Sequence, residues 1–128
     1  MKVIHSDKAP VAVRPYSQGI EVNGLLFFSG MLPINPKASE IEAKDIVGQK
    51  TQVLENISEL LGSQGLSLKN VVKTTIFLDS IDDFAEVNKV YGTYFSEHKP
   101  ARSCVAVQDI PKGALVEIEI IASTLGGA

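Results

Sequence analysis

The chain has 128 residues, 45% of them hydrophobic, and a formal net charge of −3. This length predicts a single domain over residues 1–128, with enough apolar residues for a hydrophobic core. The charges are scattered and form no basic cluster, which disfavours nucleic acid as the main partner because phosphate binding needs a positive surface. With no run as long as a membrane span, no signal-peptide core and a single cysteine, the sequence predicts a soluble cytoplasmic protein.

The first forty residues are typical of short strands. Residues 3–5 predict one strand, and two apolar-rich segments, 16–22 and 25–31, flank the dipeptide Asn23-Gly24. This dipeptide favours a type I′ hairpin turn, which requires positive φ at both central residues. Two prolines within residues 33–39 then predict a loop.

A first helix is predicted from Asp45, a suitable N-cap, to about residue 63, where Gly62 and Gly65 provide a stop signal. Its apolar residues recur at helical spacing and predict one buried stripe. The residues expected in that stripe are Ile46, Val47, Val53, Leu54, Ile57, Leu60 and Leu61.

Residues 71–78 predict a strand that follows the first helix. Ser80 and Asp83 then resemble a capping box and predict a second helix that ends near residue 97. Residues 101–108 and 115–123 predict the last two strands. On the strand, one face is expected to carry Val72, Thr74, Ile76 and Leu78. The side chains that the helix is expected to bury are Phe84, Val87, Val90 or Tyr91, Tyr94 and Phe95.

This order of elements predicts an α+β fold with a mixed sheet, and two helices can cover only one of its faces. Several predicted strands carry apolar residues on both faces. In the segment 25–31, Leu26 and Phe28 lie on one face and Leu25 and Phe27 on the other. A sheet that is apolar on both sides, with helices for one side, predicts oligomerisation through the other face.

Residues with obvious chemistry are few. The chain has two histidines, no Cys/His set with metal-ligand spacing, no phosphate-binding glycine loop and no nucleophile elbow. We therefore expect no metal ion and no cofactor.

Arg102 and Cys104 are two residues apart in a predicted strand and therefore share a face. A permanent cation beside a polarisable thiol is compatible with the wall of a small anion-binding pocket. The alternative is a solvated arginine and a buried cysteine that acts as a small hydrophobic residue.

The last predicted strand carries Glu117 and Glu119 on one face and apolar residues on the other. The simpler interpretation is a half-solvated strand. The functional interpretation requires one glutamate to lie near Arg102, where the opposite charge would keep it ionised and able to orient or activate a water molecule.

Four other positions are candidates, each with a structural alternative. Tyr16 lies between loop and strand signals and can serve packing alone. Ser29 and Gly30 end a predicted strand, where glycine would let a ligand approach the backbone. Asn88 lies beside the apolar stripe of the second predicted helix, although an exposed polar residue is the default there.

Several segments together resemble a known family across nearly the full chain. They are Arg-Pro-Tyr-Ser-Gln at 14–18, Phe-Ser-Gly at 28–30 with Pro33, Val-Lys-Thr-Thr-Ile-Phe at 72–77, Asp83-Phe84 with Val87-Asn88, Pro-Ala-Arg-Ser-Cys-Val at 100–105 and Val-Glu-Ile-Glu at 116–119. The set is similar to the Rid family, also called YjgF-like proteins, and within it to the RidA branch of reactive intermediate deaminases. The resemblance implies a chorismate-mutase-like fold and a homotrimer with its sheets at the centre, its helices outside and its active sites between subunits.

The resemblance also implies an activity. RidA-like enzymes hydrolyse reactive enamines and imines from pyridoxal-phosphate enzymes, such as 2-iminobutanoate and 2-iminopropanoate, to 2-oxo acids and ammonia, without a cofactor of their own. By the match, Arg102 binds the substrate carboxylate and Glu117 holds or activates water. The other substrate-binding residues implied by the match are Tyr16, Ser29, Gly30, Asn88 and Cys104.

Two alternatives stay open at this point. One is a non-catalytic trimer that binds 2-oxo acids in the same cleft and regulates; some Rid relatives lack the critical arginine, so Arg102 favours catalysis. The other is a ribonuclease or translation inhibitor, which the acidic balance disfavours. Met31 stands where many family members carry glutamine, which leaves the substrate range open.

Overall fold

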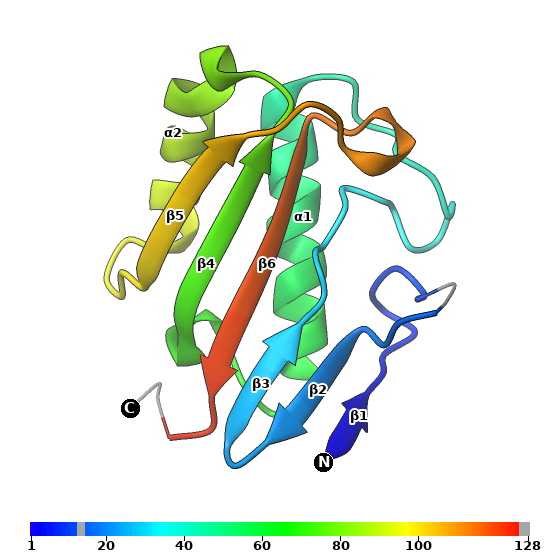
Figure 1. Ribbon diagram of the computed structural model, residues 1–128, viewed down its shortest axis with the longest axis vertical. Helices are drawn as coiled ribbons and strands as arrows, with labels where there is room; N and C mark the ends of the chain where they lie inside the picture. The colour runs from blue at the N-terminus through cyan, green and yellow to red at the C-terminus, as the bar shows by residue number, and fades with distance from the viewer. Residues whose placement is uncertain (13–14, 126–128) are drawn as a thin grey trace.

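The computed structural model describes residues 1–12 and 15–125. They form a six-stranded sheet in the order β1-β2-β3-β6-β4-β5, with both helices packed on one face (Figure 1). The strands are β1 (Lys2–Ile4), β2 (Gly19–Val22), β3 (Leu25–Phe28), β4 (Val71–Leu78), β5 (Ala101–Ala106) and β6 (Val116–Ser123), and the helices are α1 (Ile46–Gly62) and α2 (Phe84–Tyr94). β4 and β5 are parallel and the other pairs antiparallel, so the predicted α+β fold with a mixed sheet and two helices on one face is confirmed.

The hairpin between β2 and β3 has the predicted turn. Asn23 and Gly24 have φ values of 53° and 77°, both in the left-handed region that a type I′ turn requires. Both strands are shorter than predicted, because the chain leaves the β2–β3 ladder after Phe28 and rejoins the sheet at Met31. There the backbone N–H of Met31 donates to the carbonyl of Ile118 at 2.7 Å. Ser29 and Gly30 therefore lie in a short irregular segment between two paired stretches.

α1 begins where the sequence predicts, with the Asp45 carboxylate accepting from the backbone N–H of Gly48 at 3.1 Å. Its apolar stripe packs on the sheet as expected except at Val47, which is 41% exposed. The buried face also contains polar residues. Among them, Asn56 donates to the carbonyls of Leu32 and Ile34 and so holds the loop after β3 against the helix. Within the described part of the chain, no helix is both long and apolar enough to cross a membrane.

Besides Val47, the predicted face of Val72 and the predicted burial of Phe84 are wrong, each for a local reason. The register between β4 and β6 shifts between Val71 and Lys73, so Val72 is an extra residue in the ladder and is 41% exposed. Ser80 caps a 3-10 turn (Ile81–Asp83) instead of α2, and α2 starts at Phe84, which is 38% exposed. This helix ends at Tyr94, earlier than predicted.

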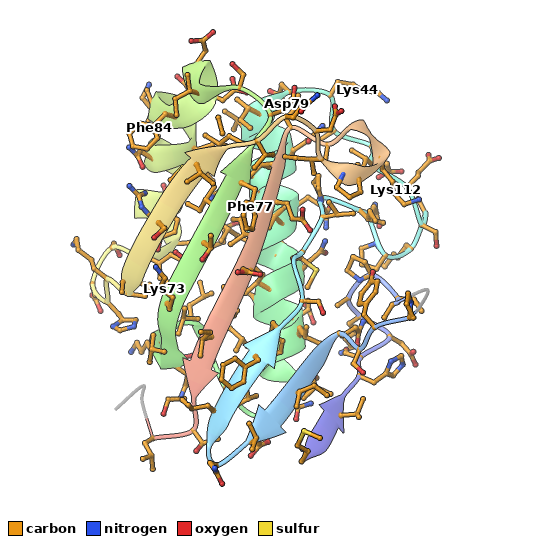
Figure 2. All side chains as sticks on the ribbon, viewed as in Figure 1. Lys44, Lys73, Phe77, Asp79, Phe84 and Lys112 are labelled. Carbon is orange, nitrogen blue, oxygen red and sulfur yellow. The ribbon has the colours of Figure 1, made fainter. Side chains whose placement is uncertain are left out.

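The sheet face opposite the helices is uncovered within the chain; we call it the open face. Lys73 and Phe77 project from β4 on this face, toward the viewer in Figure 2, because they alternate with the buried residues of the strand. Phe27 on β3 is 42% exposed here. Oligomerisation through this face, as a homotrimer, stays a prediction.

Candidate functional site

Arg102 lies on the helix side of β5 and is fixed by residues of α2. It pairs with Thr74 of β4, whose side chain points into the core toward α2. Its Nη1 donates to Oδ1 of Asn88 at 2.6 Å, and its guanidinium carbon lies 5.0 Å from the centre of the Tyr91 ring. A second ring, that of Phe84, is 5.8 Å away. Arg102 is nevertheless exposed, so it presents an oriented cation at the surface.

Cys104 lies on the same side of β5 as Arg102, as predicted from their spacing. It pairs with the buried Ile76 and is half-buried at the edge of the core. Burial raises the pKa of its thiol, and the charges of Arg102 and Lys50 oppose this rise without cancelling it. A thiol with a raised pKa stays protonated near neutral pH, so the position is suited to a pocket wall rather than to a nucleophile.

Glu117 lies on the open face, opposite the face that carries Arg102. It pairs with Phe77 of β4 and is half-buried against Gly30. A β-carbon at position 30 would collide with the Glu117 carboxylate, so glycine is what leaves room for this side chain. Burial, with a smaller contribution from the Glu119 charge, raises the pKa of Glu117. Glu117 and Arg102 of the same chain are therefore not neighbours, and a position of Glu117 near an Arg102 side chain stays a prediction for the assembled protein.

Tyr16, Ser29 and Gly30 come together in a pocket at the edge of the sheet where β2 begins and β3 ends. Met31 and Lys112 also contribute to its lining. Ser29 Oγ donates to the carbonyl of Ser17 at 2.6 Å, which fixes the irregular segment beside Glu117. The Tyr16 side chain is 54% exposed and is accessible from solvent.

The predicted site residues thus form two separate groups, and the Arg102 and Glu117 side chains in them lie on opposite faces of the sheet. The arginine group consists of Asn88, Arg102 and Cys104, and the glutamate group of Tyr16, Ser29, Gly30 and Glu117. Arg14, the first residue of the motif at 14–18, lies outside the described residues. No cluster of three or more His, Cys, Asp or Glu side chains within residues 1–12 and 15–125 could hold a metal ion.

A family model described as Endoribonuclease L-PSP matches residues 6–124. The chain belongs to this family, that of the YjgF/Rid proteins. It is 48% identical over 121 residues to a RutC family protein of Pyrococcus horikoshii, covering 94% of this chain and 96% of that one. It is 42% identical over 124 residues to a 2-iminobutanoate/2-iminopropanoate deaminase of Escherichia coli, with coverages of 94% and 96%. A solved structure of a putative endoribonuclease from Thermotoga maritima superposes with a TM-score of 0.94 at 44% identity, covering 98% of this chain and 99% of that one.

The sequence did not reveal two residues of this YjgF/Rid protein that interact with the arginine group, one by contact and one electrostatically. Tyr91 was expected only as core, yet it lies under Arg102 and its hydroxyl is 2.9 Å from that of Thr74. Lys50 was not singled out, although it lies on the apolar stripe of α1 between Ile46 and Leu54. Its side chain is fully buried, with Nζ 5.1 Å from the centre of the Tyr91 ring. A lysine at helical spacing within an apolar stripe is the signal that would have indicated it.

Proposed function

We propose that this protein hydrolyses 2-imino acids and their enamine tautomers, such as 2-iminobutanoate and 2-iminopropanoate, to 2-oxo acids and ammonia. The observation that carries this proposal is the setting of Arg102. Its guanidinium is exposed, held by Asn88 at 2.6 Å and placed over two aromatic rings. Such a guanidinium can bind the substrate carboxylate through two parallel hydrogen bonds. The 42% identity to proteins named 2-iminobutanoate/2-iminopropanoate deaminase supports this chemistry.

In the proposed reaction, water adds to the electrophilic imine carbon to give a carbinolamine, which then expels ammonia and leaves the 2-oxo acid. Glu117 moves a proton from the attacking water to the imine nitrogen, and then a second proton from the carbinolamine hydroxyl to that nitrogen as the C–N bond breaks. Burial raises its pKa toward the working pH, which favours a carboxyl that both accepts and donates protons. Tyr16 and Ser29 line a pocket that also includes Gly30, the residue against which the Glu117 carboxylate lies. No cofactor is needed, because the imine carbon is already activated.

We further propose that each active site takes the arginine group from one subunit and the glutamate group from another. Within one chain the two groups face away from each other across the sheet. β5 pairs only with β4, so its other edge is available to a neighbouring subunit. The open face, where Glu117 and Phe27 lie, is partly apolar and suited to burial in a homotrimer.

A coupled assay tests the proposed activity. The protein is added to a threonine dehydratase reaction in which semicarbazide competes for the imine. We expect faster formation of 2-oxobutanoate and less semicarbazone with the wild-type protein, and no acceleration with Arg102→Met. A folded, assembled wild-type protein that leaves both rates unchanged would exclude the enzyme and favour the non-catalytic 2-oxo-acid-binding trimer.

The description of the family model, Endoribonuclease L-PSP, raises ribonuclease activity as a second candidate. The net charge of −3 does not favour an RNA substrate, because polyanion binding needs a positive surface. Incubation with single-stranded RNA at low salt, with Glu117→Gln as the control, distinguishes the two. Cleavage by the wild type alone would assign the site to RNA.

A further inference from the structure

Lys50 is the one fully buried charged side chain among the described residues. It projects from α1 into the space between the two helices and the sheet. Its Nζ has no hydrogen-bond partner in the described part of the chain and lies 5.1 Å from the centre of the Tyr91 ring. Burying an ammonium without a hydrogen-bond acceptor costs free energy of folding, which favours the neutral amine at this position.

Tyr91 lies between this amine and the proposed carboxylate-binding group. The Arg102 guanidinium carbon is 5.0 Å from the same ring centre, so two basic side chains share one aromatic ring. A like charge nearby disfavours the ammonium form of a buried amine. Burial lowers the pKa of Lys50 to about 7; Cys104 opposes this shift and Arg102 adds to it.

The other titratable groups that face Lys50 are neutral near pH 7, so Arg102 is the permanent charge that acts on it. On β5, the two residues that interact electrostatically with the Lys50 amine are Arg102 and Cys104. The Cys104 thiol is uncharged near neutral pH because burial raises its pKa. From α2 it faces Tyr91, whose phenol pKa is also raised by burial and which therefore stays neutral. The protonation of Lys50 thus responds to whatever offsets the charge of Arg102.

We propose that Lys50 is a positioning residue that couples the binding of a carboxylate at Arg102 to proton uptake. The inference rests on the proposed function in one respect, namely that Arg102 binds the carboxylate of a 2-imino or 2-oxo acid. With the site empty, the charge of Arg102 disfavours the ammonium form of Lys50. A bound carboxylate offsets that charge, Lys50 takes a proton, and its ammonium in turn attracts the carboxylate and strengthens binding.

Linkage fixes the sign of the effect. A ligand that raises the pKa of Lys50 binds more tightly at pH values where Lys50 is protonated in the complex, so affinity rises as pH falls. An upward shift of one unit on binding corresponds to about a tenfold gain in affinity from pH 9 to pH 6. Lys50 does not touch the reacting atoms in this proposal and acts only through Arg102 and the ligand charge.

Isothermal titration with 2-oxobutanoate tests the coupling, because this carboxylate is stable and keeps one charge from pH 6 to pH 9. The wild-type protein is expected to bind about tenfold more tightly at pH 6 than at pH 9. At pH 7, titrations in two buffers of different ionisation enthalpy should report net proton uptake. Lys50→Met, which keeps the length of the side chain, should bind with little pH dependence. Lys89→Met, which removes an exposed lysine of α2, should behave as the wild type.

Each outcome is decisive. An equal pH dependence in wild type and Lys50→Met overturns the proposal, as does wild-type binding without proton uptake or no binding at any pH. The proton-uptake measurement needs no variant, so it stands even if Lys50→Met fails to fold. If imine hydrolysis is absent while 2-oxobutanoate binding still depends on pH through Lys50, the proposed function fails and the coupling holds. If hydrolysis is present and the coupling is absent, the reverse is established.

Discussion

Arg102 and Glu117 project from opposite faces of one sheet. Arg102 pairs with Thr74, which contacts α2, whereas Glu117 pairs with Phe77 on the open face. A substrate as small as an imino acid cannot contact both side chains of the same chain through the sheet. The proposed reaction therefore requires two subunits at each site, and this requirement can be tested directly.

Mixed assemblies of two inactive variants should regain activity. Arg102→Ala removes the carboxylate-binding group and Glu117→Ala removes the proton-transfer group, so each alone should be inactive in the semicarbazide assay. When both chains are co-expressed, some interfaces combine an intact Arg102 with an intact Glu117. We expect a measurable fraction of wild-type activity from the mixture, whereas activity no higher than in the separate variants would contradict a site shared by Arg102 and Glu117 of two subunits.

Removing the guanidinium and removing its support should have different effects. Arg102→Met should lower kcat/KM about 100-fold or more, because an oriented charge-assisted contact to the carboxylate is lost. Asn88→Ala leaves the charge and removes the 2.6 Å hydrogen bond that orients it, so we expect a smaller loss, mainly in KM. Arg102→Lys is the control for charge without the fork geometry. Equal losses in Asn88→Ala and Arg102→Met would contradict an orienting role for Asn88.

Gly30→Ala should impair catalysis more than folding. An added β-carbon would collide with the Glu117 carboxylate, which must then move. We expect a loss of kcat of about 10- to 1000-fold, since misplacement of a general acid–base by about 1 Å is sufficient for a large effect. Gly62→Ala serves as the control, because an added β-carbon there would meet nothing within 4 Å. Gly30→Ala with unchanged kcat would show that the position of Glu117 is not critical.

Lys50→Met should stabilise the protein and change its pH dependence. Since the pKa of Lys50 is about 7 in the folded chain and 10.5 as the reference value, the unfolded chain binds more protons between these values. Wild-type stability should therefore rise with pH from about 7 to 10.5, and the variant should lack this contribution. The expected gain in free energy of unfolding at pH 7 is up to about 4 kcal/mol.

Urea unfolding at several pH values measures this difference, with Lys89→Met as the exposed-lysine control. A Lys50→Met protein that is less stable than the wild type at pH 7 would show that the amine has a stabilising partner in the assembled protein. In that case the charge of that partner would also contribute to the pKa of Lys50.

Much of the fold follows from local patterns. Asn23-Gly24 determines a turn through backbone sterics alone, and the apolar stripe of α1 needs only helical periodicity, so both were predictable. Val72 was not, because a one-residue register shift depends on how β4 aligns with β6, a partner distant in sequence. Phe84 was misassigned because Ser80 begins a 3-10 turn before α2.

The residues that share a face of one strand were predictable, but the arrangement of these pairs in the sheet was not. Alternation placed Arg102 and Cys104 on one face and Glu117 and Glu119 on one face, and the structure agrees with both pairs. Which of the two sheet faces each strand presents depends on strand order and on the side that the helices cover. These are properties of the whole sheet, so spacing within a strand could not reveal that Arg102 and Glu117 diverge.

Tyr91 joins the interior of the protein to its surface. Its ring lies close to both Lys50 and Arg102, and its hydroxyl is 2.9 Å from that of Thr74 on β4. A displacement of α2 that moves this ring would disturb a core strand and the arginine group together. Native-state hydrogen exchange should therefore show the amides of α2 around Tyr91 and those of β4 around Thr74 opening as one cooperative unit, with no independent local opening beneath Arg102.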